Sequence, residues 1–270
     1  LVAPGGVGKT AWSVAAGAAI ASGRAILGDR VHARANVLFA NLEDPEDEFD
    51  RRLAACMDRH GVEAAELEGR VFTVNGRDRR LVVAALEADG VTVCYPDKEA
   101  LVQHITDNRI GVVFVDPFVN SHELEENSNP HINAATRAWA EIAELTGCAV
   151  VLIHHTRKGA VAGDMDSGRG ASALVAACRV GVTLTAMSPE EAEELGVLER
   201  ERRLHVRLDD AKANLAPPGD KARWFKLASV ALGNATPAYP GGDHVQALVP
   251  WEPPSVWKAL TPQDCNAALD

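Results

Sequence analysis

Long apolar runs are absent from this sequence of 270 residues. Gly, Asp or Lys interrupts each apolar stretch well before the ~20 residues that a membrane-spanning helix needs, which excludes a membrane span. Cysteine is also scarce and scattered, and no C-x-x-C pair occurs among Cys56, Cys94, Cys148, Cys178 and Cys265. Because this pattern suits neither a disulfide framework nor a zinc site, we expect a reduced, cytoplasmic setting.

Positive charge is in deficit, with 27 Lys and Arg against 38 Asp and Glu and a formal net charge of −11. That balance excludes a surface coated in basic groups for nonspecific duplex DNA binding, but it leaves room for a local basic channel. Aromatic residues make up only 5% of the chain, whereas 47% of all residues are hydrophobic. This composition is typical of an Ala-rich globular α/β protein.

Short apolar runs alternate with longer helical patterns, which predicts an α/β fold of the RecA-like P-loop type, with a mostly parallel central sheet flanked by helices. The expected strands are 37–42, 71–74, 112–116, 149–154, 179–185, 204–208 and 224–232. The expected helices are 9–22, 45–60, 97–108 and 132–146. Pro and Gly after residue 215 predict antiparallel edge strands followed by an extended segment. We therefore expect one ATPase domain over 1–235 and a Pro/Gly-rich tail over 236–270.

A phosphate-binding loop opens the chain, because APGGVGKT at residues 3–10 matches the pattern [AG]-x-x-x-x-G-K-[ST]. In such a loop the backbone N–H groups surround phosphate oxygens at a helix N-terminus, Lys9 adds a positive charge, and the Thr10 hydroxyl ligates Mg²⁺. The loop predicts binding of ATP and Mg²⁺. The signature starts so near Leu1 that we expect an N-terminal truncation within the first strand of the domain. The predicted nucleotide-binding residues are Pro4, Gly5, Gly6, Val7, Gly8, Lys9, Thr10 and Ala11.

An apolar strand ending in a carboxylate, GVVFVDP at residues 111–117, supplies the second element of such a site. Asp116 at its end is the expected magnesium ligand together with Thr10. Pro117 follows where many related enzymes carry a glutamate, so the group that deprotonates the attacking water must come from another strand end. Glu43 is the candidate. The alternative is a purely structural turn, in which Asp44 is the N-cap of the next helix.

Two imidazoles, His154 and His155, end another apolar strand, VVLIHH, at the same expected edge of the sheet. A neutral histidine can hydrogen-bond the γ-phosphate and respond to its loss. The alternative is that both rings only satisfy backbone groups of the following loop. That loop, RKGAVAGDMDSGRGAS at residues 157–172, is Gly-rich and basic, which is typical of a long functional loop.

Several longer strings together resemble one known family, the RecA-like ATPases related to the RepA-type hexameric replicative helicases of plasmids and to AAA-family ATPases of phage and prophage regions. Besides the phosphate-binding loop, they are LEDPEDEFDRRL, VVFVDPFVNSHELEENSNPHIN, VVLIHHTRKG, SGRGASALVAACRV and DDAKANLAPP. The resemblance covers nearly the whole chain. It implies ATP hydrolysis by a homo-oligomer, such as a hexameric ring, with the residues matching its motifs in the roles that follow.

By this resemblance, Glu43 is the catalytic carboxylate, Asp116 the second magnesium-site residue, and the pair His154 and His155 the γ-phosphate sensor. Arg179 is an arginine finger that reaches into the site of a neighbouring subunit, assisted by Lys212. The basic loop residues resemble the DNA-facing loops of RecA-like rings, and a merely solvated loop is the alternative. These predicted DNA-binding residues are Arg157, Lys158 and Arg169.

The leading hypothesis is therefore an oligomeric ATPase that moves along single-stranded DNA or unwinds DNA in the replication of a mobile element. A recombination or repair ATPase that does not unwind DNA is a second hypothesis. A third, from another functional class, is an ATP-operated switch that binds protein partners with little turnover. The fold alone does not decide between them.

Overall fold

The computed structural model describes residues 1–155, 171–214 and 222–254. Their helices are α1 (Lys9–Ser22), α2 (Glu46–His60), α3 (Ala64–Leu67), α4 (Lys98–Asp107), η1, a 3-10 helix (Phe118–Ser121), α5 (Asn129–Thr146), α6 (Ala171–Ala177), α7 (Pro189–Glu194) and α8 (Glu199–Arg202). None of the helices in these ranges is long and apolar enough to cross a bilayer.

The strands of the same ranges form one larger and two smaller groups by hydrogen bonding. They are β1 (Val2–Ala3), β2 (Asn36–Asn41), β3 (Val71–Asn75), β4 (Ala84–Leu86), β5 (Val93–Cys94), β6 (Ile110–Asp116), β7 (His122–Glu123), β8 (Ala149–Leu152), β9 (His154–His155), β10 (Val180–Ala186), β11 (His205–Ala213), β12 (Arg223–Ala231) and β13 (His244–Pro250).

The central sheet is continuous through a single residue, Ile153, that separates β8 from β9. One part has the order β3-β2-β6-β8 and the other the order β13-β12-β11-β10-β1-β9. All neighbours from β3 to β10 are parallel, whereas the pairs among β10, β11, β12 and β13 are antiparallel. The predicted α/β fold with a parallel sheet and antiparallel edge strands is confirmed.

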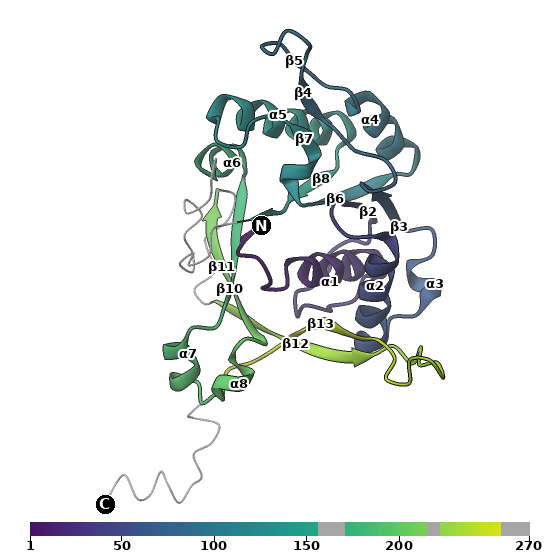
Figure 1. Ribbon diagram of the computed structural model, residues 1–270, viewed down its shortest axis with the longest axis vertical. Coiled ribbons are helices and arrows are strands. Elements are labelled where there is room, and N and C mark those ends of the chain that lie inside the picture. Colours follow the sequence, from purple (N-terminus) through teal and green to yellow (C-terminus); the bar gives the residue numbers. More distant parts are fainter. Residues whose placement is uncertain (156–170, 215–221, 255–270) are drawn as a thin grey trace, which may run out of the picture.

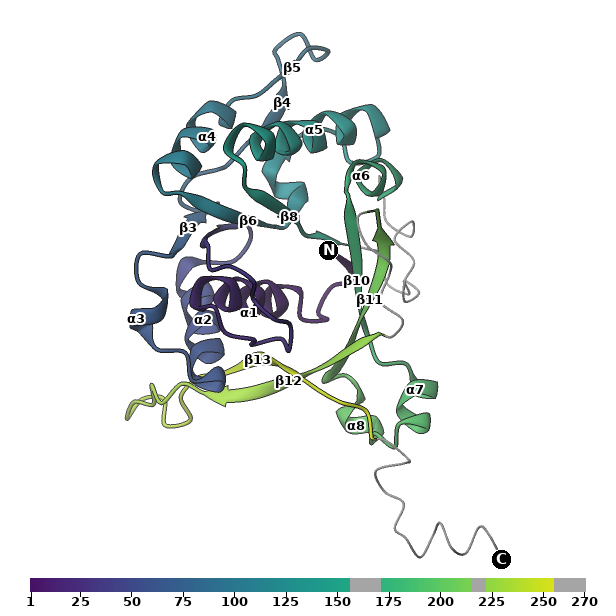
Figure 2. The same cartoon turned by 180° about the vertical axis from the view of Figure 1, so that it is seen from behind.

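Helices cover both faces of this sheet, as its solid apolar strands require. Alternate residues of β2 enter different clusters, since Phe39 packs with α1 while Leu38 packs with α4 and α5. In Figure 1 the β12–β13 hairpin passes on the far side of α1, which lies enclosed between that hairpin and the central strands. The view from behind in Figure 2 shows the same enclosure. The domain thus wraps around α1, the helix that begins at the phosphate-binding loop.

One predicted strand, 149–154, is interrupted. The N–H of Ile153 donates to the Val115 carbonyl at 3.0 Å, and its own carbonyl accepts from the N–H of Phe118 at 2.7 Å. The next residue, His154, already pairs with Val2 of β1. The chain therefore changes partner strand at Ile153, which continuous apolar sequence does not reveal.

The tail predicted over 236–270 contains a strand instead at its start. The residues of β13 pair with β12 in a register that runs from Ala231↔His244 to Phe225↔Pro250. Ala247 and Leu248 are buried. The Pro and Gly residues on both sides conceal this short apolar run in the sequence, and the prediction of an extended tail is wrong for it.

Candidate active site

The carboxyl ends of four parallel strands meet at one edge of the sheet. Ala3 at the end of β1 lies opposite His155 of β9, and Asn41 at the end of β2 lies opposite Asp116 of β6. Polar side chains that follow parallel strands gather at this edge, where ligands bind in open α/β sheets. The predicted site residues of separate segments are thereby brought together.

The phosphate-binding loop has the backbone that its glycines permit. Gly6 and Gly8 take φ values of 78° and 89°, in the left-handed region where a side chain is strained. A Cβ atom at Gly5 or Gly6 would meet no atom within 4 Å, so the space in front of the loop is open. Helix α1 begins right after Gly8 without a side-chain cap. Its free N–H groups and dipole make this helix start a place for an anion such as phosphate.

Lys9 brings a buried positive charge to the loop. Its side chain is 6% exposed, and its Nζ donates to the carbonyls of Pro4 at 2.7 Å and Ala3 at 3.4 Å. Burial lowers the pKa of Lys9, while the carboxylates of Asp116 and Glu43 act in the opposite direction. The ammonium group is held inside the loop by carbonyl oxygens alone, a position from which it can bind phosphate oxygens.

Asp116 and Thr10 form an oxygen pair, with the Thr10 hydroxyl donating to Asp116 Oδ2 at 2.8 Å. Burial raises the pKa of Asp116, and the Thr10 hydroxyl and the Lys9 charge oppose that shift. A carboxylate and a hydroxyl side by side are hard oxygen ligands of the kind that Mg²⁺ prefers. The residues present therefore fit magnesium bound beside the phosphate loop.

Glu43 and His155 face each other at this edge, with His155 Nε2 3.8 Å from Glu43 Oε2. The side chains are 62% and 40% exposed respectively, so both reach the space that a ligand would enter. Burial and then the charge of Lys9 lower the pKa of His155, which keeps the imidazole neutral near pH 7. A carboxylate and a neutral imidazole thus lie beside the loop, Lys9 and Asp116.

The backbone around Glu43 is fixed by two residues that the sequence analysis missed. Asn120 donates from its side-chain amide to the Leu42 carbonyl at 3.2 Å, and Arg77 donates from Nε to the Glu43 carbonyl at 2.9 Å. The Leu42 N–H in turn donates to the Asp116 carbonyl at 2.8 Å. Both clamping residues lie far from Glu43 in the sequence, and no motif marks them.

A family model described as an AAA domain, AAA_25, matches residues 1–161, more than half of the chain. The chain belongs to this AAA domain family. Among solved structures, it is similar to the ATPase domain of a helicase, with a TM-score of 0.56 and 12% sequence identity over 93% of this chain and 83% of that chain. At this identity the similarity concerns the fold. The matched part of the AAA domain contains the phosphate-binding loop, Glu43, Asp116 and His155.

The turn after β2 in the AAA domain does not have the predicted cap. The N-cap of α2 is Pro45, without a side-chain hydrogen bond, so the prediction of Asp44 at this position is wrong. Asp44 instead pairs with Arg52 at 3.2 Å, and its N–H donates to Asn41 Oδ1 at 3.3 Å. Asn41 closes the turn, which leaves Glu43 at its exposed tip.

The two predicted sensor histidines lie on opposite sides of their strand, because successive side chains of a strand alternate. His155 faces Glu43, whereas His154 is 6% exposed and its ring lies 6.2 Å from that of Phe118. His122 packs on the same phenyl ring, with centroids 4.9 Å apart. Only one member of the pair therefore reaches the edge where the candidate site lies.

Buried His122 predicts acid sensitivity of the AAA domain. Its Nδ1 accepts from the Leu124 N–H, and its Nε2 has no partner among the described residues. Burial, more than the nearby His154, lowers the pKa of His122 to about 4. The unfolded chain binds this proton below its ordinary pKa of about 6.5, but the folded chain does not. The free energy of unfolding should thus fall by about 3 kcal/mol between pH 6.5 and 4 from this group.

Urea unfolding at pH 7 and pH 4 measures this effect by comparing wild type with His122→Asn. The variant should lose about 3 kcal/mol less than wild type on acidification. His32→Asn, at an exposed position, is the control and should behave as wild type. Equal losses in wild type and His122→Asn would show that His122 is not the responsible group.

Arg179 and Lys212 are not at the phosphate-binding loop of their own chain. Arg179 is exposed and precedes β10, whereas the loop follows β1, and these two strands are parallel neighbours. The two groups therefore lie toward opposite edges of the sheet. Lys212 donates to the carbonyls of Val175 at 2.7 Å and Ala176 at 3.2 Å, a contact typical of a helix C-terminus. The predicted DNA-binding residues Arg157, Lys158 and Arg169 lie outside the described residues.

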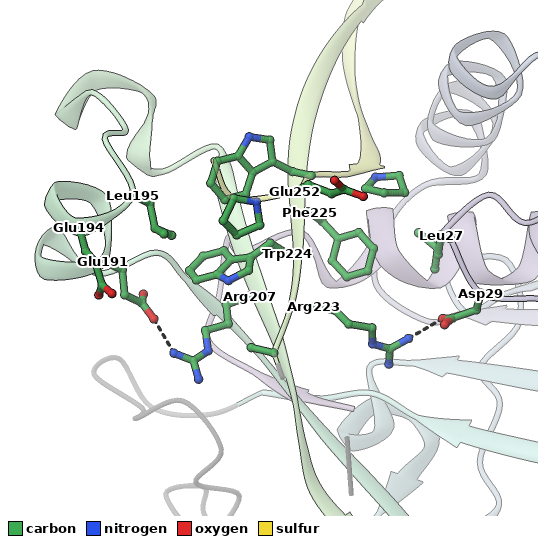
Figure 3. A pocket seen from close by; sticks show the side chains of 15 residues that line it. Leu27, Asp29, Glu191, Glu194, Leu195, Arg207, Arg223, Trp224, Phe225 and Glu252 are labelled. Atoms are coloured by element: carbon green, nitrogen blue, oxygen red, sulfur yellow. Dashed lines mark hydrogen bonds and ion pairs between the residues drawn. The ribbon is translucent and has the colours of Figure 1, made fainter. Parts of the chain in front are cut away.

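A cavity of about 710 Å³ lies elsewhere, between α7, the start of β12 and the residues after β13 (Figure 3). Trp224 and Trp251 line it. The ion pair of Arg207 with Glu191, at 2.6 Å, and that of Arg223 with Asp29 form parts of its wall. No residue of the candidate site lines this cavity. Its size therefore does not make it the place of the chemistry.

Proposed function

We propose that the AAA domain hydrolyses ATP at the carboxyl edge of its sheet, with Glu43 as the general base. The observation that carries the proposal is the convergence of Glu43, His155, Lys9 and the Thr10–Asp116 pair beside one open phosphate-binding loop. These residues come from four strand ends and supply the groups that phosphoryl transfer to water needs.

Each residue has one role in this proposal. Lys9 and the backbone N–H groups of the loop bind and orient the phosphates, and Thr10 with Asp116 holds Mg²⁺. When bound, the magnesium ion neutralises charge on the phosphate oxygens. Glu43 orients the attacking water and accepts its proton. The exposed position of Glu43 and its fixed backbone suit that role.

His155 is proposed as the γ-phosphate sensor, because its imidazole lies 3.8 Å from Glu43 and is neutral near pH 7. Ring and backbone then connect it to the interior through its neighbour His154, which contacts Phe118. A change of hydrogen bonding at His155 on loss of the phosphate can thus reach β9 and the segment after Asp116. This role supports coupling of hydrolysis to motion of neighbouring segments.

Assembly and DNA binding complete the proposal. Arg179 is exposed and directed away from its own phosphate-binding loop, which suits an arginine finger that serves a second copy of the chain. The resemblance to RepA-type helicases supports a ring that moves on single-stranded DNA, contacted by Arg157, Lys158 and Arg169. Such contacts to phosphates are electrostatic and independent of sequence.

Steady-state ATP hydrolysis with and without single-stranded DNA tests this function. We expect a basal rate that rises severalfold on DNA addition and falls again with increasing salt, because phosphate contacts are salt-dependent. A rate that is the same with and without DNA would contradict the DNA-dependent motor. Nucleotide binding without measurable turnover would favour an ATP-operated switch instead.

A further inference from the structure

A cavity of about 380 Å³ opens directly beside the phosphate-binding loop. Three segments distant in the sequence form its walls: the loop with Gly6, Gly8 and Ala11, the first turns of α2 with Glu48, and the start of β13 with Gln246. Lys9, Thr10, Glu43 and Asp116 do not line it. The cavity is therefore separate from the candidate metal ligands and base but continuous with the loop. Its volume lies in the range of small-molecule sites.

The position of this cavity matches one end of a bound triphosphate. Lys9 and Thr10 contact the terminal phosphates and the metal in a phosphate-binding loop. The phosphate nearest the nucleoside lies toward the opposite end of the loop, where α1 continues with Ala11. A group attached to that phosphate enters the space that Gly6, Gly8 and Ala11 border.

Charge in the cavity is balanced. Arg51 and Arg52 are matched by Glu48 and Asp243 among the lining residues. Both arginines also donate to Glu48, from Nε of Arg51 at 3.2 Å and from Nε of Arg52 at 2.9 Å. A balanced, internally paired wall does not favour a further anion, and it suits an uncharged polar group such as a base with its ribose.

Gln246 is the polar group best placed to recognise such a ligand. Gln246 and Leu248 lie on one face of β13, and Leu248 packs in the same cluster as Val7 of the loop and Leu227. A methyl of Leu227 lies 3.0 Å from where a Cβ of Gly8 would be. Gln246 therefore faces the loop, and its side-chain amide makes no hydrogen bond to a described residue. An amide both donates and accepts, as the edge of a nucleobase requires.

We propose that this cavity, the nucleoside pocket, binds the base and ribose of ATP, with the Gln246 amide on the edge of the base. The inference rests on the proposed function and extends it by a wall from β13. It makes the C-terminal hairpin part of the nucleotide site, although the phosphate-binding loop lies at the other end of the chain.

Calorimetric titration of the whole protein with a non-hydrolysable ATP analogue and with inorganic tripolyphosphate, both with Mg²⁺, tests the pocket. Wild type should bind the analogue more tightly than tripolyphosphate. Gln246→Trp fills the pocket and should weaken the analogue by more than about tenfold, while Gln246→Ala should weaken it by roughly two- to tenfold, the value of one hydrogen bond. Neither variant should change the affinity for tripolyphosphate.

Two matched controls place the same side chains elsewhere. Thr73→Trp adds the ring at an exposed position of edge strand β3, and Gln103→Ala removes an exposed amide from α4. Both should bind the analogue as wild type does.

The outcomes separate the pocket from the proposed function. Unchanged affinity for the analogue in Gln246→Trp would put the nucleoside elsewhere, and an equal loss for tripolyphosphate would mean that position 246 acts on the loop. Either result overturns the nucleoside pocket while leaving ATP binding intact. Wild type that binds neither ligand would contradict the proposed function and the pocket together.

Discussion

The Glu43→Gln variant is expected to hydrolyse ATP about 10²- to 10⁴-fold more slowly than wild type, with its affinity for ATP retained. Glutamine has the size of glutamate, but its amide cannot accept the proton of the attacking water. The backbone of residue 43 is held by Asn120 and Arg77, so the substituted side chain should occupy the same place. Phosphate release and equilibrium binding, measured on the same preparation, separate the two effects.

A second glutamate provides the control for this variant. Glu46 is exposed in the first turn of α2, three positions along the chain from Glu43. Glu46→Gln should hydrolyse ATP at the wild-type rate. If Glu43→Gln kept that rate as well, the general base would be another residue. If the variant lost ATP binding together with turnover, Glu43 would act in binding the nucleotide.

The Arg179→Ala variant is expected to lose turnover by about 10³-fold or more, the usual effect of removing an arginine finger. The physical reason is the loss of a guanidinium group that neutralises charge on the transferred phosphoryl group in the site of the neighbouring copy. Because Arg179 lies toward the opposite edge of the sheet from its own loop, ATP affinity of the isolated chain should not change.

Arg200→Ala, at an exposed position in α8, is the matched control and should leave turnover unchanged. Size-exclusion chromatography with light scattering shows whether Arg179→Ala still assembles as wild type does. Full activity of an assembled Arg179→Ala variant would rule out the finger and with it the proposed site between copies.

Local sequence signals predicted those elements whose ends carry their own markers. Helix α1 is bounded by Gly8 and Gly23, both with left-handed backbones, and its predicted range 9–22 agrees with the structure. The prediction failed where pairing with distant residues decides the structure. The change of partner at Ile153 depends on hydrogen bonds to Val115 and Phe118, and β13 exists because β12 offers it a partner.

The candidate site shows the same division. Lys9, Thr10, Glu43 and Asp116 follow strand ends of a parallel sheet, and such ends share one edge in any α/β fold, so their convergence could be predicted. Which histidine faces that edge depends on the pleat of β9, which the sequence alone did not resolve. The clamp by Asn120 and Arg77 joins segments that no motif connects.

Mixing two inactive variants tests the central claim most directly, namely that one ATP-hydrolysing site needs Glu43 of one chain and Arg179 of another. Differently tagged Glu43→Gln and Arg179→Ala chains are co-expressed, purified through both tags and assayed for ATP hydrolysis. Each mixed contact of one orientation then combines an intact Glu43 with an intact Arg179. The account predicts that turnover reappears in the mixed assembly, although each variant alone is inactive. Mixed assemblies that stay as inactive as the single variants would contradict it.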